Sequence, residues 1–160
     1  MARRGRRGDG GAERRAGVLA PQDTLVVVCR GGECGSRSKH PGVDHADQLR
    51  RIRAAADTAT AAATATGGRA DVAVSSCLDA CERSNVVVVV PGARDRADGV
   101  TPVWVGPVLQ EDATEDLAGW LLAGGPSTPA PPLVDILAFQ PTRTSRRELE
   151  EPGTLSGRAR

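Results

Sequence analysis

Short apolar runs rich in valine recur along the chain, and the pattern within each run predicts a strand. In residues 85–92, "NVVVVVPG", apolar side chains occupy successive positions, which is typical of a strand covered on both faces. Residues 23–29, "DTLVVVC", have the same character, and β-branched side chains favour extended backbone. The predicted strands comprise residues 23–29, 70–76, 85–92 and 101–106.

Helical periodicity marks the chain between the first two of these strands. Apolar residues at three- and four-residue steps predict an amphipathic helix over residues 44–57, and Asp44 and Asp47 can cap its first turn. The low-complexity segment "TATAAATATGG" at residues 58–68 either continues this helix or forms a surface insertion. The apolar positions of the helix are Val43, Ala46, Leu49, Ile52 and Ala56.

A second helix is predicted after the last strand, in "TEDLAGWLLAGG". Asp112 and Glu115 have the spacing of a capping box at its start, and the helix dipole favours negative charge there. Gly124 and Gly125 are expected to stop the helix. The residues of its apolar face are Leu117, Trp120 and Leu121.

The order of these elements is β-α-β followed by β-β-α. A βαβ unit places its two strands parallel, whereas the hairpin-type turn "ARDRADGV" makes the last two strands an antiparallel pair. The sequence therefore predicts an α/β fold, a four-stranded mixed sheet with flanking helices. This is the thioredoxin-like architecture.

Composition divides the 160-residue chain into three parts. Residues 1–20 are rich in Arg and Gly and lack periodicity, so we predict a disordered tail. Residues 21–125 hold the predicted elements and form one domain, whose core must be aliphatic because only 2% of the chain is aromatic. Residues 126–160 are Pro-rich and predict a largely irregular arm, in which the apolar run at 133–139 adds a strand or packs against the domain.

The formal net charge of +1 conceals a segregation of charge along the chain. Both ends are rich in arginine, whereas the body between them is acidic, so it lacks the basic face expected for nucleic-acid binding. No apolar run is long enough to span a bilayer, and no apolar stretch follows the basic N-terminus as in a signal peptide. We therefore predict a cytoplasmic protein that binds neither nucleic acid nor a membrane.

The four cysteines are the candidate chemistry of the chain. Cys29 and Cys34 form a C-x4-C pair, and Cys77 and Cys81 form a C-x3-C pair. Cys29 ends the first predicted strand and Cys77 follows the second, and parallel neighbouring strands end at the same edge of a sheet. All four thiols can therefore converge. In a reducing compartment, such cysteines indicate metal binding or redox chemistry more than structural disulfides.

The residues around the cysteines suit a metal cluster with inorganic sulfide. Gly31, Gly32 and Gly35 permit unusual backbone angles, so that backbone N–H groups can approach negatively charged sulfur. Such hydrogen bonds tune the reduction potential of a cluster. Arg30 and Arg83 stand beside the cysteines and can offset the negative charge. These five residues are the predicted lining of a cofactor site.

Several segments together resemble the thioredoxin-like [2Fe-2S] ferredoxins, a family that is also similar to the cluster domain of a peripheral respiratory complex I subunit. The segments are "LVVVCRGGECG", "KHPGVDHADQLRRI", "VSSCLDACERSNVVVV" and "PVWVGPVL", within residues 23–125. The resemblance implies a [2Fe-2S] cluster in the domain at 21–125, with Cys77 and Cys81 on one iron and Cys29 and Cys34 on the other. It also implies a one-electron carrier, often a homodimer. We therefore expect a protein that catalyses no reaction alone and works with a redox partner protein, either a reductase or an acceptor enzyme. We expect that partner to dock on an acidic surface around the cluster end.

Three other interpretations of the cysteines remain open. They can be small buried apolar residues, since free cysteine is often buried. Four thiolates can bind structural zinc, although neither pair has the C-x2-C spacing of common zinc knuckles. A thiol–disulfide oxidoreductase is compatible with the fold, but the C-x-x-C motif that opens the first helix in such proteins is absent.

Histidine and tryptophan offer weaker candidates. His40 and His45 lie in the loop and at the helix start, where an exposed or capping histidine is the common outcome, and no Cys-x-His pattern supports them as ligands of a Rieske-type centre. Trp104 and Trp120 are predicted to be large core residues and not electron relays.

Overall fold

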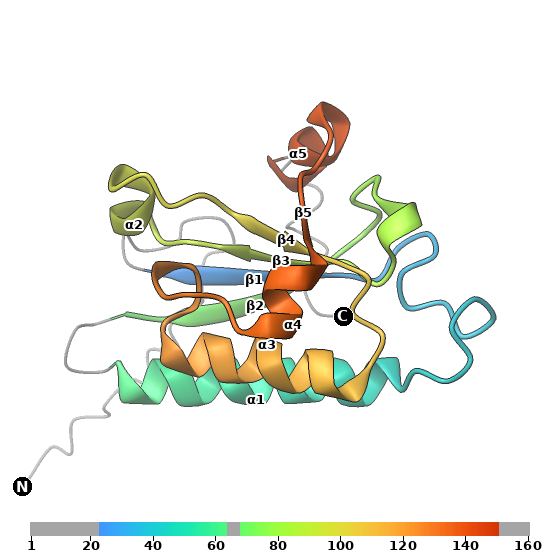
Figure 1. Cartoon of the computed structure of the whole chain (residues 1–160), viewed down its shortest axis with the longest axis horizontal. Coiled ribbons are helices and arrows are strands. Elements are labelled where there is room, and N and C mark those ends of the chain that lie inside the picture. Colours follow the sequence, from blue (N-terminus) through green and yellow to red (C-terminus); the bar gives the residue numbers. More distant parts are fainter. Residues whose placement is uncertain (1–22, 64–67, 151–160) are drawn as a thin grey trace, which may run out of the picture.

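The computed structural model describes residues 23–63 and 68–150, which form a mixed α/β structure around a five-stranded sheet (Figure 1). The strand order is β2-β1-β3-β4-β5. β1 and β2 are parallel, and each of the other neighbouring pairs is antiparallel. The strands are β1 (Thr24–Cys29), β2 (Ala70–Ser75), β3 (Val87–Val90), β4 (Val103–Val105) and β5 (Ala138–Phe139).

Two long helices, α1 and α3, lie side by side along one face of the sheet, and the short helix α5 lies on the opposite side (Figure 1). None of the helices in the described part of the chain is long and apolar enough to cross a membrane. The helices are α1 (His45–Ala62), α2 (Ala93–Ala97), α3 (Glu111–Ala123), α4 (Pro132–Leu137) and α5 (Arg143–Glu150), with 3-10 turns η1 (Cys81–Arg83) and η2 (Gly125–Ser127).

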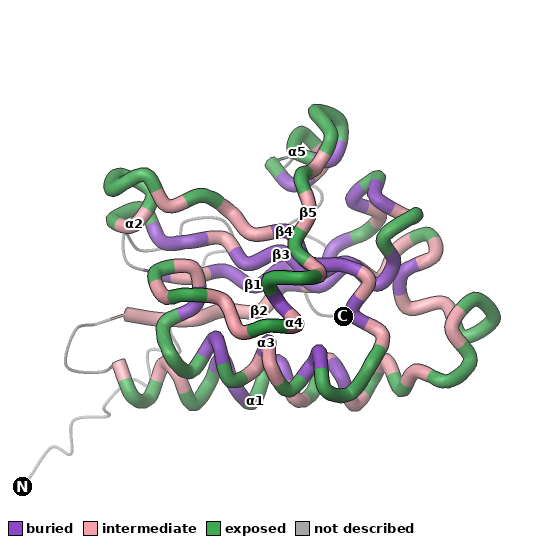
Figure 2. Tube along the Cα trace, in the orientation of Figure 1, coloured by how far each residue is buried: buried purple, intermediate pink, exposed green. Residues whose placement is uncertain are grey.

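The central strands are buried on both faces, as their unbroken valine runs predict (Figure 2). Alternate residues of β1 enter different clusters: Val26 and Val28 pack with Ile52 of α1 and with α3, whereas Val27 and Cys29 face the other side. The second cluster also holds Trp104, and Trp120 lies in the first, so both tryptophans are core residues as predicted. Cys29 therefore belongs to the second hydrophobic cluster and, as the last residue of β1, lies at the edge of that cluster.

The first helix is longer than predicted, because the Ala/Thr-rich segment continues it to Ala62. Its predicted cap is confirmed: the Asp44 carboxylate accepts a hydrogen bond from Asp47 N at 2.9 Å. The capping box predicted from Asp112 and Glu115 is wrong. Helix α3 begins at Glu111, which shifts both residues out of the capping positions, and its N-cap residue Gln110 makes no side-chain cap hydrogen bond. The predicted stop is confirmed by Gly124, which follows the helix at φ +122°.

The hairpin between β3 and β4 is confirmed by their antiparallel pairing, in which Val88 lies opposite Trp104. The connection is not a simple turn, however, because residues 93–97 of "ARDRADGV" form the short helix α2. This helix is followed by Gly99 at φ +90°, a left-handed conformation that favours glycine.

The prediction of a four-stranded sheet is wrong, because the C-terminal segment adds β5 next to β4. The apolar run at 133–139 divides into α4 and this two-residue strand, and Phe139 packs edge-on against Trp104 with ring centroids 6.1 Å apart. The arm predicted as largely irregular instead forms α4, β5 and α5 within the described residues up to 150. The predicted disordered tail, residues 1–20, lies outside the described residues.

Candidate functional site

Two loops meet at the edge of the sheet where β1 and β2 end. In the parallel pairing Cys29 lies opposite Ser75, as the βαβ prediction requires. The loop after β1 is held to the second loop by Arg30 N, which donates to Ser75 O at 3.1 Å. Cys29 N also donates to Val86 O at 3.0 Å, which ties the end of β1 to the residue before β3. The C-x4-C and C-x3-C motifs therefore share one edge.

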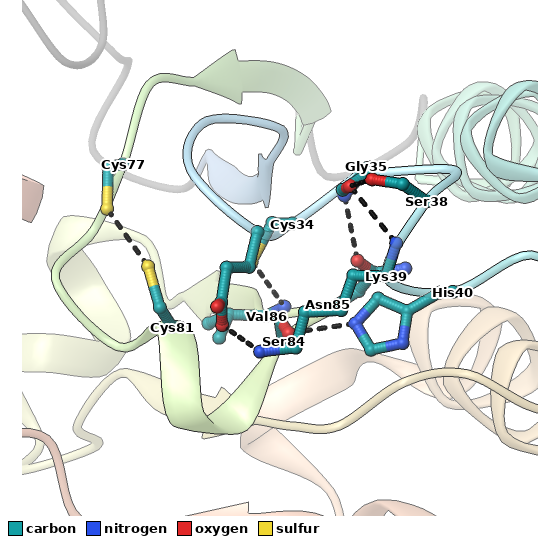
Figure 3. Close-up of polar contacts among 12 residues, drawn as sticks. Cys34, Gly35, Ser38, Lys39, His40, Cys77, Cys81, Ser84, Asn85 and Val86 are labelled. Atoms are coloured by element: carbon teal, nitrogen blue, oxygen red, sulfur yellow. Dashed lines mark hydrogen bonds and ion pairs between the residues drawn. The ribbon is translucent and has the colours of Figure 1, made fainter.

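Cys77 and Cys81 form a pair in the second loop. Their side chains point toward each other, with 3.5 Å between the sulfurs (Figure 3). Asp79 N donates to Cys77 Sγ at 3.4 Å, and Asp79 itself adopts a left-handed conformation at φ +53°. Both cysteines are partly exposed, so this pair is within reach of solvent or a partner.

Cys29 and Cys34 form a second, buried pair, each only 2% exposed. A side-chain hydrogen bond between them lowers the pKa of Cys29 to about 6, against the opposing effect of burial, and the same bond raises the pKa of Cys34. Val86 N donates to Cys34 Sγ at 3.4 Å (Figure 3). The loop after β1 thus folds back so that Cys34 lies next to Cys29, although only four residues separate them in sequence.

The pairs influence each other electrostatically. Burial and contact with Cys81 raise the pKa of Cys77, and the charge of Cys29 raises it further. The charge of Cys81 in turn raises the pKa of Cys34. Negative charge on one pair therefore opposes ionisation of the other, and four thiolates at this edge would need positive charge between them.

Gly31 and Gly32 are packed directly against the second loop. A Cβ on Gly32 would lie 3.0 Å from Cys81 Sγ and 3.4 Å from Cys77 Sγ, and its φ of +59° also favours glycine. A Cβ on Gly31 would lie 2.3 Å from Cys77 N. Gly35 has a different role, because its N–H donates to Asn85 Oδ1 at 2.8 Å. The glycines predicted at the cofactor site thus hold two cysteine loops together.

The Arg30 guanidinium is fixed beside the buried pair. It donates to Cys29 O at 3.1 Å, to His45 O at 3.1 Å and to Gln48 Oε1 at 3.0 Å. Burial lowers the pKa of Arg30, and the nearby Cys34 and Cys29 charges raise it. Arg30 therefore places a positive charge beside Cys29 and Cys34.

Arg83 has a different neighbour from the one predicted. Its guanidinium carbon lies 5.3 Å from the centroid of the Phe139 ring, in a cation–π contact with β5. The sequence places Arg83 two residues after Cys81, but its side chain lies against β5, whose position in the sheet the sequence left open.

Ser84 and Asn85, which carry no recognisable motif, contact the two histidines and connect the loops. Asn85 is fully buried, and its Nδ2 lies 3.1 Å from His45 Nδ1. His40 Nε2 lies 2.9 Å from Ser84 Oγ (Figure 3). Both histidines therefore bridge to the segment before β3, and neither is the exposed or capping residue that we expected. One signal was visible in the sequence, a lone asparagine placed directly before five valines.

The exposed charges of the two loops have both signs. Arg37 and Lys39 are exposed, and Lys39 pairs with Glu33. Asp79 and Glu82 are exposed on the second loop. These loops therefore do not form the acidic surface that we expected at this end.

The described side chains include no group of three or more His, Cys, Asp or Glu residues placed together as a metal-binding set. The thiols lie instead as pairs. A tetrahedral ion with metal–sulfur bonds of about 2.3 Å separates its sulfurs by roughly 3.8 Å. The 3.5 Å between Cys77 and Cys81 is close to that value and far above the roughly 2.05 Å of a disulfide bond. The Cys77–Cys81 pair therefore suits two coordination positions on one metal ion.

Comparisons with known proteins give no match: no family model, no curated protein and no solved structure matches the chain.

Proposed function

We propose that the protein is a [2Fe-2S] ferredoxin of thioredoxin-like fold, which binds its cluster through Cys29, Cys34, Cys77 and Cys81 and carries single electrons. The observation that carries this proposal is the arrangement of the thiols as two pairs at one sheet edge. A [2Fe-2S] cluster takes four thiolates, a pair on each iron, so thiols arranged as two pairs suit it better than they suit one tetrahedral ion, which needs all four sulfurs around one point. The strand order β2-β1-β3-β4, with α1 and α3 together on one face, supports the thioredoxin-like assignment.

The residues around the thiols would have different roles once a cluster is bound. When bound, the cluster would supply a centre that accepts and returns one electron. Cys29 and Cys34, each 2% exposed, would keep one side of it away from water, and Arg30 would offset part of its negative charge. Cys77 and Cys81 are partly exposed and lie beside the exposed Gly32, so the electron would enter and leave on their side.

The proposal also defines the partners. The protein would catalyse no reaction alone and would work in the cytoplasm with a reductase or an acceptor enzyme, either as a monomer or as a homodimer. The charges of both signs around the cysteine loops favour a partner surface that is likewise of mixed charge.

Thiol–disulfide exchange is a second candidate, because the lowered pKa of Cys29, about 6, beside another thiol is a feature of redox-active cysteines. However, Cys29 and Cys34 are both 2% exposed, so a substrate disulfide could not reach the activated sulfur. The partly exposed Cys77 has a raised pKa, which disfavours attack as a thiolate. The site geometry therefore favours metal binding over exchange.

The deciding experiment is anaerobic purification of the full chain, followed by its absorption spectrum and by iron, zinc and acid-labile sulfide analysis. We expect visible charge-transfer bands and about two irons and two sulfides per chain. Colourless protein with one zinc and no sulfide would overturn the cluster and select structural zinc. Metal-free protein that cycles reversibly between dithiol and disulfide would select thiol–disulfide exchange.

A further inference from the structure

The C-terminal helix α5 makes a specific contact with the loop that carries Cys77. Ser145 Oγ donates to Asp79 O at 2.9 Å, although 66 residues separate the two in sequence. Ser145 is only 1% exposed, whereas Asp79 is an exposed residue, so the hydrogen bond is partly buried and its donor is shielded from water. One turn further along α5, Leu149 enters the hydrophobic cluster that contains Cys29 and Leu78. The helix is thus anchored both to the core and to the cysteine loop.

Asp79 needs such an anchor. Its φ of +53° lies in the left-handed region, which costs a residue other than glycine about 1 kcal/mol, although aspartate adopts it more readily than most, and contacts with the surroundings offset this cost. In this conformation its N–H donates to Cys77 Sγ at 3.4 Å. The backbone of Asp79 is therefore fixed at both ends, by a thiol on its N–H and by Ser145 on its carbonyl.

Thr142 extends the hydrogen bond between Ser145 and Asp79 into a chain, in which each hydroxyl has a defined role as donor or acceptor. Its Oγ1 accepts from Ser145 N at 3.0 Å and lies 2.9 Å from Ser145 Oγ. Because the Ser145 hydroxyl donates its proton to Asp79 O, the Thr142 hydroxyl is the donor between the two side chains. Hydrogen bonds in such a chain polarise one another, so the bond to Asp79 is strengthened.

We propose that Ser145 is a positioning residue for Cys77: it holds Asp79 in the conformation that directs the Asp79 N–H at the Cys77 sulfur. A helix of the C-terminal arm is then part of the cysteine site. The effect on electron transfer rests on the proposed function, since an N–H bond to a ligand sulfur raises the reduction potential of an iron–sulfur cluster and its loss lowers it.

The test compares Ser145→Ala with Thr144→Ala in the full chain, because Thr144 is exposed on the same helix and offers a matched loss of a hydroxyl. In the reduced, metal-free protein, hydrogen exchange of the Asp79 amide is followed by NMR. We expect Ser145→Ala to accelerate exchange at Asp79 about fivefold, the effect of losing one hydrogen bond of about 1 kcal/mol, with the amides of α1 and α3 unchanged. Thr144→Ala should leave Asp79 unchanged.

Equal exchange at Asp79 in the two variants would overturn the proposal, and so would faster exchange throughout α1 and α3, which would mean a general loss of stability. A second variant, Leu149→Ala, loosens α5 without touching the hydroxyl and should accelerate Asp79 less than Ser145→Ala does. In cluster-loaded protein, Ser145→Ala should also lower the reduction potential, whereas Thr144→Ala should not. If wild-type protein forms no cluster, the proposed function fails while the exchange measurement still decides the role of Ser145.

Discussion

Gly32 lies directly over Cys81, so closely that a Cβ on the glycine would come within 3.0 Å of the cysteine sulfur. The contact joins the two cysteine motifs, which come from different strands and approach at a position where only a hydrogen fits. The loop after β1, which contains Gly31 and Gly32, therefore helps to position the thiols through close packing. This role is separate from any hydrogen bond that its N–H groups donate.

We predict that Gly32→Ala disrupts the site. The φ of +59° and the contact with Cys81 Sγ both oppose a side chain, so the free energy of unfolding of metal-free protein should fall by about 1–3 kcal/mol. Iron bound per chain should fall as well. Chemical denaturation and iron analysis measure the two effects.

Gly42→Ala is the matched control, because the same substitution there meets no atom within 4 Å. It should retain both wild-type stability and wild-type iron content. Wild-type behaviour of Gly32→Ala would mean that the two loops do not need this close approach.

We predict that Cys34→Ala loses most of its bound iron. Cys34 is buried in the same hydrophobic cluster as Cys29, and the two thiols shift each other's pKa, so Cys34 is the second ligand of that pair under the proposed function. Iron and sulfide analysis after anaerobic purification measures the loss. Ser38→Ala, an exposed change in the same loop, should keep the full complement. Full retention of the cluster in Cys34→Ala would remove Cys34 from the ligand set.

The shared sheet edge of the cysteines could be predicted from the sequence, because it depends on one strong rule. The strands before Cys29 and Cys77 are joined by a helix, so they must be parallel and must end together, as Cys29 and Ser75 do. The valine runs likewise predicted burial on both faces, since no polar residue interrupts them.

The C-terminal arm could not be predicted in this way. The apolar run at 133–139 left open whether it adds a strand or packs against the domain, and the two-residue strand β5 is defined by a tertiary contact, the pairing of Phe139 with Trp104 of β4. Helix α5 is mostly polar, and its buried positions Ser145 and Leu149 are too few to give an apolar pattern. Two contacts depend on these elements: Arg83 lies on the Phe139 ring of β5, and Ser145 of α5 donates to the loop that carries Cys77. Neither contact could be predicted without the positions of β5 and α5.

We predict that Arg30 has separable roles in geometry and in charge. Arg30→Gln should lower stability by about 1–3 kcal/mol, because His45 O and Gln48 Oε1 lose a charged donor, and should lower the reduction potential of loaded protein by removing a positive charge. Arg30→Lys keeps the charge but lacks the planar guanidinium, which donates to several acceptors at once. It should therefore lower stability, while the reduction potential changes less than in Arg30→Gln. Arg37→Gln, at an exposed position, should change neither quantity appreciably. A potential that shifts equally in the lysine and glutamine variants would show that charge is not the relevant property.

We predict that His45 makes the protein less stable in mild acid. Burial lowers the pKa of His45 below its ordinary value of 6.5, and the charges of Arg30, His40 and Arg37 lower it further, against a backbone hydrogen bond involving Ser36 that raises it. The folded state thus favours the neutral ring, so the stability that depends on it is present above pH 6.5 and is lost progressively as the pH falls below that value, until the folded protein is protonated too.

Besides burial, the hydrogen bonds of Asn85 also favour the neutral ring of His45. Asn85 Oδ1 accepts from Gly35 N at 2.8 Å, which fixes the amide so that Nδ2 donates to His45 Nδ1 at 3.1 Å. A proton on Nδ1 would place two donors against each other. His45→Gln can still accept from Asn85 but does not titrate, so its unfolding free energy should decline less between pH 7 and pH 5 than that of wild type, as measured by urea denaturation at each pH. Parallel declines in the two proteins would show that another group causes the acid sensitivity.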